Sequence, residues 1–276
     1  MNPVILVPTD FSENALLAAR FALSIAPQLK ASVCLMHAYS WVQSAFQGEQ
    51  AGEKARHEAE EAVRAEMEAF ISQIPGHPNL EEPLFIPGQL RDAIRKVNSE
   101  REVILWVMGT TGATGLRYHV LGSNTYEVAR HLTSVPLIVV PPGITRFQLE
   151  KIGFFTDFNP GDKYTLAVLN RLFGTFSGEI KMIHFGDPED EAEEEKKLAD
   201  WAEALCTDTG IASLPYEWVS GEEGVEAIRN LGEPFDLLAL TPIDRGFMEN
   251  LITHSMAKEL IHQSEVPVFL VSREEE

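Results

Sequence analysis

The sequence predicts an α/β protein built from two similar doubly wound domains, each with a five-stranded parallel sheet and helices on both faces. Three observations predict this fold. Short apolar strands alternate with helical stretches, which is typical of parallel sheets because each helix returns the chain to the same edge. The second half of the chain repeats motifs of the first. A glycine-bearing segment follows the fourth strand of the first half, where such folds bind ligands.

The elements of the first half follow from hydrophobic periodicity and from capping residues. Strands are expected where short apolar runs lie between turn residues, and helices where apolar residues recur every third or fourth position. Ser12 is expected to cap the first helix, because its side chain can accept a hydrogen bond from a free N–H of the first turn. The expected order is strand 3–8, helix 12–27, strand 32–38, helix 50–73, strand 83–87, helix 89–99, strand 103–108, helix 123–133 and strand 136–140.

The second half repeats the first at a constant offset of 147 residues over its opening elements. The triplet 9–11, Thr-Asp-Phe, returns at 156–158, and His37 returns as His184. With small gaps, the apolar strand that closes the first half also has a copy near the C-terminus. A doubled unit of this kind predicts two domains of the same fold.

The two domains are expected at residues 1–143 and 150–276, joined by the segment from Pro142 to Glu150. Asn159 and Pro160 are expected to be the cap and the first residue of the opening helix in the second domain.

Composition excludes several classes of function. The chain has 42 acidic and 22 basic residues and a formal charge of −20, which repels nucleic acid and anionic lipid surfaces. No apolar segment approaches the length of a membrane span, and no signal or transit peptide is indicated, so a cytoplasmic location is expected. The two cysteines, Cys34 and Cys206, are expected to be reduced packing residues and not a disulfide or a metal site.

The segment 109–124, GTTGATGLRYHVLGSN, has the spacing of a phosphate site between a strand and a helix. Glycine allows backbone to approach a ligand, and free N–H groups at the start of the helix face an anion. A doubly wound topology would bring Asp10, at the end of the first strand, into the same crevice. Two alternatives stay open: a tight strand-to-helix crossover for the glycines, and a helix-capping turn role for Asp10.

Four motifs together resemble the universal stress protein family, specifically a tandem two-domain member: PTDFS, MHAYS, MGTTG-x9-GSNT and VPLIVVP. The resemblance covers nearly the whole chain and implies an adenine nucleotide alpha hydrolase-like fold. The pattern G-x2-G-x9-G-[ST] is the signature of the ATP-binding members, so the resemblance implies ATP as ligand, with ADP or AMP as alternatives and magnesium as a candidate companion. It implies these contacts: Pro8, Thr9, Asp10, Ala38, Met108, Gly109, Thr111, Gly112, Gly122, Ser123, Asn124 and Thr125.

The second half departs from this pattern. An alignment anchored on the prolines of the closing strands places Leu240 at Gly109, Ile243 at Gly112 and Thr253-His254 at Gly122-Ser123, and Phe185 stands at Ala38. These bulkier residues predict one nucleotide per chain, bound by the N-terminal domain.

The resemblance also predicts that the closing strands of the two domains, Val135 to Val140 and Val266 to Val271, pair edge to edge within one chain as a pseudo-dimer. A homodimer through other faces, or a protein partner, stays open.

The expected function is that of an ATP-binding stress-response regulator. The sequence has no P-loop, no dinucleotide-binding glycine motif after the first strand and no nucleophile elbow, and no catalytic or metal-binding residues are assigned. Two alternatives remain: a nucleotide-independent interaction module of the same fold, and a slow ATP hydrolase in which Asp10, Arg117 or His119 would take part.

Overall fold

The computed structural model describes residues 2–41, 49–110, 125, 128, 135–174, 178–221, 235–241 and 266–271. The first half contains β1 (Val4–Pro8), α1 (Glu13–Leu29), β2 (Ser32–Tyr39), α2 (Glu49–Ile71), β3 (Leu84–Pro87), α3 (Leu90–Glu100), β4 (Val103–Gly109) and β5 (Leu137–Val140). The second half contains β6 (Lys151–Phe155), α5 (Asp162–Phe173), β7 (Glu179–Gly186), α6 (Glu191–Thr209), β8 (Tyr216–Ser220), β9 (Leu237–Leu240) and β10 (Val268–Leu270). The α/β prediction is confirmed, and most of the expected helix 123–133 lies outside the described residues.

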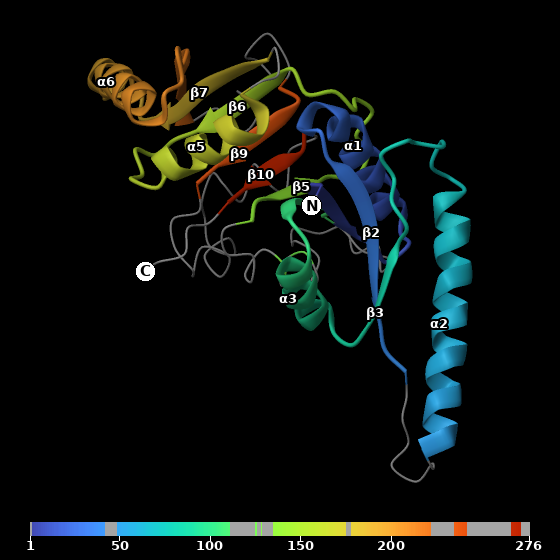
Figure 1. The fold of residues 1–276 in the computed structure, drawn as a ribbon. Helices are drawn as coiled ribbons and strands as arrows, with labels where there is room; N and C mark the ends of the chain where they lie inside the picture. The colour runs from blue at the N-terminus through green and yellow to red at the C-terminus, as the bar shows by residue number, and fades with distance from the viewer. Residues whose placement is uncertain are drawn as a thin grey trace.

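All ten strands form one sheet in the order β3-β2-β1-β4-β5-β10-β9-β6-β7-β8 (Figure 1). Within each half the neighbouring strands are parallel, and the order of the second half mirrors that of the first. The first strand of each half therefore lies between the second and the fourth, as in other doubly wound sheets. The carboxyl ends of β1 and β4, or of β6 and β9, consequently meet at one edge.

The two halves join at the centre of the sheet through an antiparallel pair of β5 and β10. Ile138 faces Phe269, and every residue of both strands is buried. The expected edge-to-edge pairing of the closing strands is thus observed within the chain. It satisfies the backbone hydrogen bonds of two strands that would otherwise be exposed edges.

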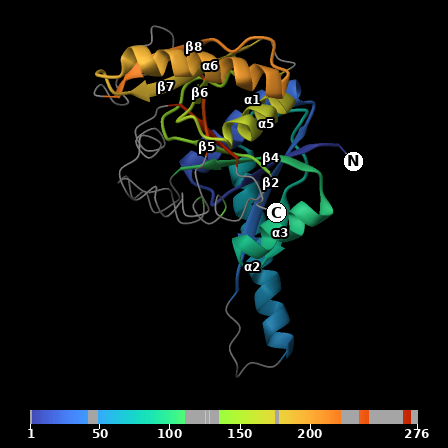
Figure 2. The same ribbon diagram turned by 90° about the vertical axis from the view of Figure 1, so that its left-hand side faces the viewer.

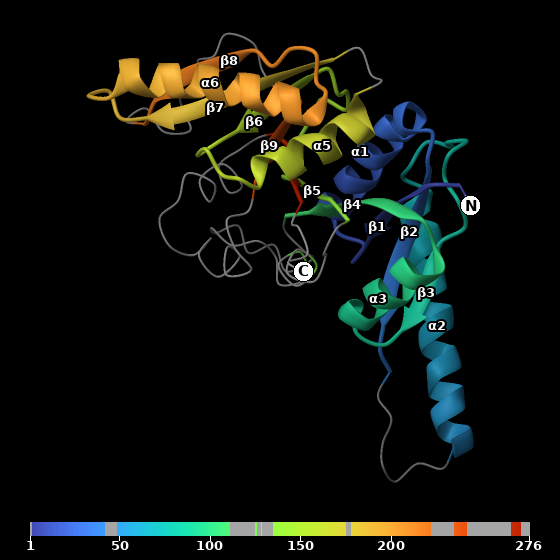
Figure 3. The same ribbon diagram turned by 60° about the vertical axis from the view of Figure 1, so that its left-hand side comes forward.

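Helices cover the sheet in two layers. On one face α1, α2, α5 and α6 share a single hydrophobic core that runs across both halves, and α1 contacts α5 (Figure 3). On the other face α3 and Val128 pack against a second core. In the second half α6 lies along β7 and β8 (Figure 2). Helix α2 runs beside β2 and β3, and its N-terminal end projects beyond them (Figure 1). Of the helices described, none is long and apolar enough to cross a membrane.

The two opening helices begin differently. Ser12 caps α1 as expected: its backbone is extended, and its Oγ accepts from the Ala15 N–H at 3.1 Å. The expectation for Asn159 and Pro160 is wrong, because α5 has Gly161 as its N-cap. The Asn159 side chain accepts from the Gly161 N–H at 2.7 Å, which closes a turn before the helix begins.

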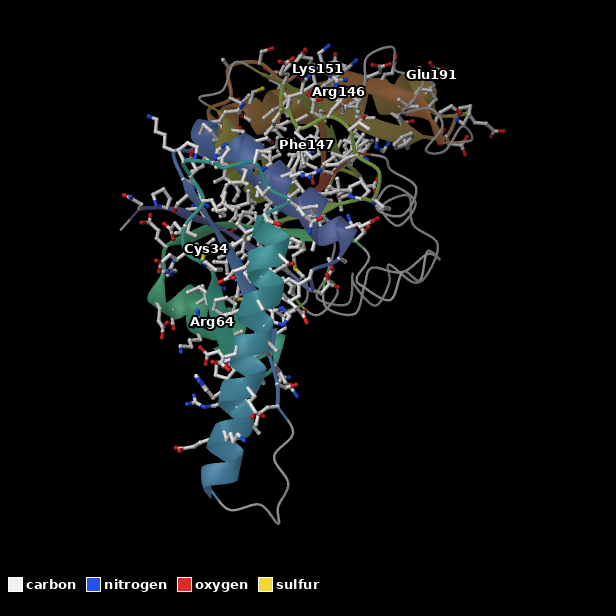
Figure 4. The ribbon with its side chains drawn as sticks, turned by 90° about the vertical axis from the view of Figure 1, so that its right-hand side faces the viewer. Cys34, Arg64, Arg146, Phe147, Lys151 and Glu191 are labelled. Atoms are coloured by element: carbon white, nitrogen blue, oxygen red, sulfur yellow. The ribbon has the colours of Figure 1, made fainter. Side chains whose placement is uncertain are left out.

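The segment between β5 and β6 is attached to the second half by one buried carboxylate. Asp236 Oδ2 accepts from the backbone N–H groups of Glu150 at 2.9 Å and Lys151 at 3.1 Å, and Oδ1 lies 3.6 Å from a guanidinium nitrogen of Arg146. Phe147, on the same segment, packs against the core that both halves share (Figure 4). The connection is therefore a packed part of the fold.

Candidate functional site

The turn after β1 holds three of the expected site residues at the carboxyl edge of the sheet. The Thr9 N–H donates to the Met36 carbonyl at 2.9 Å, and the Thr9 hydroxyl accepts from the Phe11 N–H at 3.0 Å. Asp10 Oδ1 accepts from the Ser12 N–H at 3.2 Å, as its alternative role in the turn predicts. Phe11 has a φ of 63°, a left-handed conformation that turns the chain sharply into α1.

The end of β2 lies beside this turn. The Nδ1 atom of His37 is 2.7 Å from the Thr9 carbonyl oxygen, which can only accept, so the imidazole carries a proton on Nδ1. The ring stacks on Phe11 with centroids 4.5 Å apart. Ala38 follows at the end of β2, half-buried and opposite Ile86 of β3. Its side chain is a single methyl group, the smallest that a residue other than glycine can have.

The end of β4 brings together the two ends of the glycine-bearing segment. Gly109 is the last residue of the strand, and its carbonyl accepts from the buried Thr125 hydroxyl at 2.8 Å. Leu6 of β1 lies opposite Trp106 of β4, so the two strands end at the same edge, β1 two residues later at Pro8 and β4 three residues later at Gly109. The segment therefore leaves the sheet at Gly109 and returns to it at Thr125, beside the turn that follows β1.

The structure places seven of the twelve expected contact residues, and all seven lie at this edge. They are Pro8, Thr9, Asp10, Ala38, Met108, Gly109 and Thr125. The other five lie outside the described residues, as do Arg117 and His119: Thr111, Gly112, Gly122, Ser123 and Asn124. Among the residues that the structure describes, no group of three His, Cys, Asp or Glu side chains is arranged to hold a metal ion.

Sequence reasoning missed Asn14, which lies directly behind Gly109. The Asn14 side chain is buried, with the residue 5% exposed, and its Nδ2 donates to the Val140 carbonyl at 3.1 Å. A Cβ atom on Gly109 would lie 2.8 Å from Asn14 Cγ, so glycine is required there by the packing of α1 on β4. The signal in the sequence is a polar residue on the alanine-rich buried face of α1.

The second half contains the same turn with the same hydrogen bonds. The Thr156 N–H donates to the Ile183 carbonyl at 3.0 Å, and the Thr156 hydroxyl accepts from the Phe158 N–H at 2.9 Å. Phe158 has a φ of 57°, and its ring lies 4.4 Å from that of His184, whose Nδ1 is 2.8 Å from the Thr156 carbonyl oxygen. The carboxyl edges of the two halves therefore share one backbone framework.

The side chains at the two carboxyl edges differ. Phe185 stands where the first half has Ala38, and its ring stacks on Phe155 at a centroid distance of 5.6 Å with 4° between the planes. The second half thus has stacked aromatic rings at the end of its second strand, where the first half has a methyl group.

The counterpart of Gly109 is Thr241, and the alignment with Leu240 is wrong by one residue. Trp106 N–H and Leu238 N–H each donate to the carbonyl of the proline before the closing strand, which makes these two residues equivalent. Gly109 lies three residues after Trp106, and Thr241 lies three residues after Leu238, so Gly109 and Thr241 are equivalent as well. The proposed replacements at Ile243, Thr253 and His254 lie outside the described residues.

A buried acid distinguishes the second half further. Asp162 is fully buried, and its Oδ2 accepts from the Thr156 hydroxyl at 2.5 Å and from the Trp201 indole N–H at 3.2 Å. Burial raises the pKa of the Asp162 carboxyl, and the hydrogen bonds that it accepts oppose that rise. The equivalent position in the first half is Ala15, which has no polar side chain.

Comparison with known proteins places this framework in a family. A family model described as the universal stress protein family matches residues 1–141, and no curated protein matches the chain. A universal stress protein from Archaeoglobus fulgidus DSM 4304 is 18% identical, with 98% of each chain covered and a TM-score of 0.65. A protein of unknown function from Pseudomonas aeruginosa PAO1 is 13% identical, with coverage of 98% of this chain and 92% of that one and a TM-score of 0.56.

A third likeness covers a single half. A universal stress protein solved in complex with cAMP is 25% identical over 51% of this chain and 97% of its own, with a TM-score of 0.32. The likenesses over the full length concern the fold, whereas the family model is matched by the sequence itself over 141 of the 276 residues. The chain belongs to the universal stress protein family.

Proposed function

We propose that this protein is an ATP-binding stress-response regulator of the cytoplasm that binds one adenine nucleotide per chain, in its N-terminal half. The observation that carries the proposal is the hydrogen bond between Thr125 and the Gly109 carbonyl. It brings both ends of the glycine-bearing segment to the edge where the turn after β1 and the end of β2 also lie. A segment held in this way can direct its backbone N–H groups toward a phosphate.

An anionic ligand of this protein would have to be held by local groups. The net charge of −20 opposes the approach of a nucleotide, so its phosphates would have to be held by backbone amides and by the start of the helix that contains Thr125 and Val128. The adenine would lie beside Ala38, whose small side chain leaves the end of β2 open. ADP or AMP would fit the same site, and magnesium would accompany the phosphates.

The second half supports a count of one site. We assign residues 1–143 to a nucleotide-binding domain and 150–276 to a domain with a degenerate site. In the latter, the stacked pair of Phe185 and Phe155 occupies the place proposed for adenine. The buried Asp162 carboxyl adds a group that would repel phosphate when ionised.

The test is calorimetric titration of Mg-ATP into exhaustively dialysed protein, with one residue exchanged between the halves. The wild-type chain should show one site. Ala38→Phe, which copies Phe185, should weaken ATP binding by at least ~100-fold, because an aromatic ring would fill the adenine position. The matched control is Phe185→Ala, which should leave the affinity and the count of one unchanged. Circular dichroism would establish that both variants are folded.

Four results would contradict the proposal. Two occupied sites in the wild-type chain would remove the distinction between the halves, and full binding by Ala38→Phe would place the nucleotide elsewhere. Absence of binding in the wild-type chain would favour the nucleotide-independent module. Steady phosphate release that continues at saturating ATP would instead favour the slow hydrolase.

A further inference from the structure

We propose that Asn14 is a positioning residue for the phosphate-binding segment, which it fixes at its first residue without contacting the nucleotide. This inference rests on the proposed function, since it concerns the segment that would hold the phosphates. It assigns a role to a side chain of α1 that lies outside the glycine pattern and outside the turn after β1.

Asn14 joins three elements at the point where the segment begins. Its Nδ2 donates to the Val140 carbonyl at the end of β5, and its Oδ1 accepts from the Thr110 hydroxyl at 3.4 Å. The same Val140 carbonyl accepts from the Thr110 N–H at 3.0 Å. Thr110, the first residue after β4, is thus tied to β5 by its backbone and to α1 by its side chain.

Close packing strengthens this link. Gly109 approaches Asn14 so closely that an added Cβ would lie 2.8 Å from both Cγ and Oδ1 of the asparagine. The amide is therefore confined between the backbone of β4 and the carbonyl of β5, and a buried amide of this kind keeps its orientation because any other leaves its polar atoms without partners. The direction in which the chain leaves Gly109 is consequently set by Asn14.

The second half shows that the helix can pack on the strand without this amide. At the position of Asn14 it has Gly161, and at the position of Gly109 it has Thr241. A Cβ on Gly161 would lie 2.8 Å from Cγ2 of Thr241, so the same close approach is made with the large and small residues exchanged. Packing alone is thus satisfied by either arrangement. The polar link to the following segment exists in the half that we propose binds the nucleotide.

The consequence for binding is specific to phosphate. Backbone N–H groups stabilise an anion only when they point at it, and reorganising them on binding lowers the affinity. The adenosine part of the ligand would be held by the ends of β1 and β2, whereas the Asn14 amide bonds to the end of β5 and to Thr110. Loss of the Asn14 amide should therefore weaken ATP and leave adenosine unchanged.

The experiment compares Asn14→Ala with a matched control, Asn79→Ala. Asn79 also donates a side-chain N–H to a backbone carbonyl, that of Ala31 at 2.9 Å, at the opposite edge of the sheet. The dissociation constants of Mg-ATP and adenosine are measured for the full-length wild type and both variants. Amide hydrogen exchange at Thr110 is measured in the absence of ligand.

Asn14→Ala should weaken ATP binding about tenfold, as expected for the loss of one buried and one partly buried hydrogen bond, and change adenosine binding by less than about twofold. It should also accelerate exchange of the Thr110 amide, because the Thr110 hydroxyl loses its acceptor on α1 and the residue is then held by its backbone hydrogen bond alone. Asn79→Ala should change neither the ratio of the two constants nor that exchange rate, although both variants lower the melting temperature.

The outcomes separate this inference from the proposed function. If the wild type binds ATP and Asn14→Ala keeps the wild-type ratio of ATP to adenosine affinity, the positioning role is refuted while the nucleotide site stands. If the wild type binds no nucleotide, the proposed function fails, and the positioning role fails with it. Unchanged exchange at Thr110 in Asn14→Ala contradicts the inference whatever the nucleotide data show.

Discussion

The carboxyl edges of the two halves have the same backbone arrangement but different side chains. Each has a Thr-Asp-Phe turn whose threonine hydroxyl accepts from the phenylalanine N–H, and each has a histidine bonded to the threonine carbonyl. At the end of the second strand, however, the first half has Ala38 and the second has Phe185 stacked on Phe155. The turn therefore belongs to the framework of the fold, and the two halves differ in the residues around it.

Gly109, at the end of the fourth strand, likewise has a role in the packing of the fold. Glycine at this position belongs to the pattern of the segment that we propose binds the nucleotide, and in the structure it makes room for Asn14. The second half makes the same approach with Thr241 on the strand and Gly161 on the helix. A substitution at Gly109 therefore disturbs packing before it disturbs binding, and Ala38 is the better position at which to test for a nucleotide.

The largest effect is expected at the seam between the two halves, which is the antiparallel pair of β5 and β10. Phe269 is fully buried opposite Ile138, and its ring lies 6.3 Å from that of Phe173. Phe269→Ala should lower the free energy of unfolding by about 3–5 kcal/mol, because it leaves a cavity in the shared core. Urea unfolding followed by tryptophan fluorescence and by circular dichroism should give one transition, since both halves contribute to that core.

The milder change Ile138→Val serves as the control for this seam and should cost about 1 kcal/mol. Two separate transitions in Phe269→Ala, with one at the wild-type midpoint, would show that the halves are energetically independent. The two halves would then be separate domains that share a sheet without stabilising each other.

A smaller effect tests the exchanged glycines directly. Gly109→Thr, which copies Thr241, should destabilise the protein by about 2–3 kcal/mol because its Cβ would overlap Asn14. Adding Asn14→Gly reproduces the arrangement of the second half and should recover a large part of that loss, apart from the ~1 kcal/mol cost of glycine within a helix. The free energies of the two single variants and the double variant form a double-mutant cycle. Additive changes would mean that the two positions do not compensate each other.

The smallest effect concerns the buried acid of the second half, which Ala15 replaces in the first. Burial raises the pKa of Asp162 above its unfolded value, so the unfolded chain ionises first as the pH rises. This group therefore costs no stability below the unfolded pKa, and it lowers stability progressively as the pH rises toward the folded pKa. Asp162→Asn removes that cost and should be more stable relative to wild type at pH 7 than at pH 3.

The pH series for Asp162→Asn needs thermal unfolding at several pH values with an exposed control. Asp157, whose side chain is 73% exposed, provides it as Asp157→Asn, which should follow the wild-type profile. A stability difference between Asp162→Asn and wild type that does not change with pH would show that the carboxyl keeps one charge state throughout.

Much of the framework could be predicted from the sequence because it follows from local rules. Alternating apolar runs and helical periodicity predicted the elements that the structure describes in the first half to within a few residues, and Ser12 was recognisable as a cap. Asn159 was misassigned because an asparagine that closes a turn and one that caps a helix look alike in sequence. Leu240 was misaligned because the chain from Leu238 to Pro267 is one residue shorter than the equivalent chain from Trp106 to Pro136, which the strand pairing reveals.

The sequence by itself determined the α/β class, the placement of turns and glycines at strand ends, and the family, because these depend on periodicity and on motifs of neighbouring residues. The tertiary structure alone decided three other features: the join of both halves into one sheet through β5 and β10, the contact of Asn14 with Gly109, and the burial of Asp162. Each depends on residues far apart in the chain, whose distance is fixed only when helices pack against the sheet.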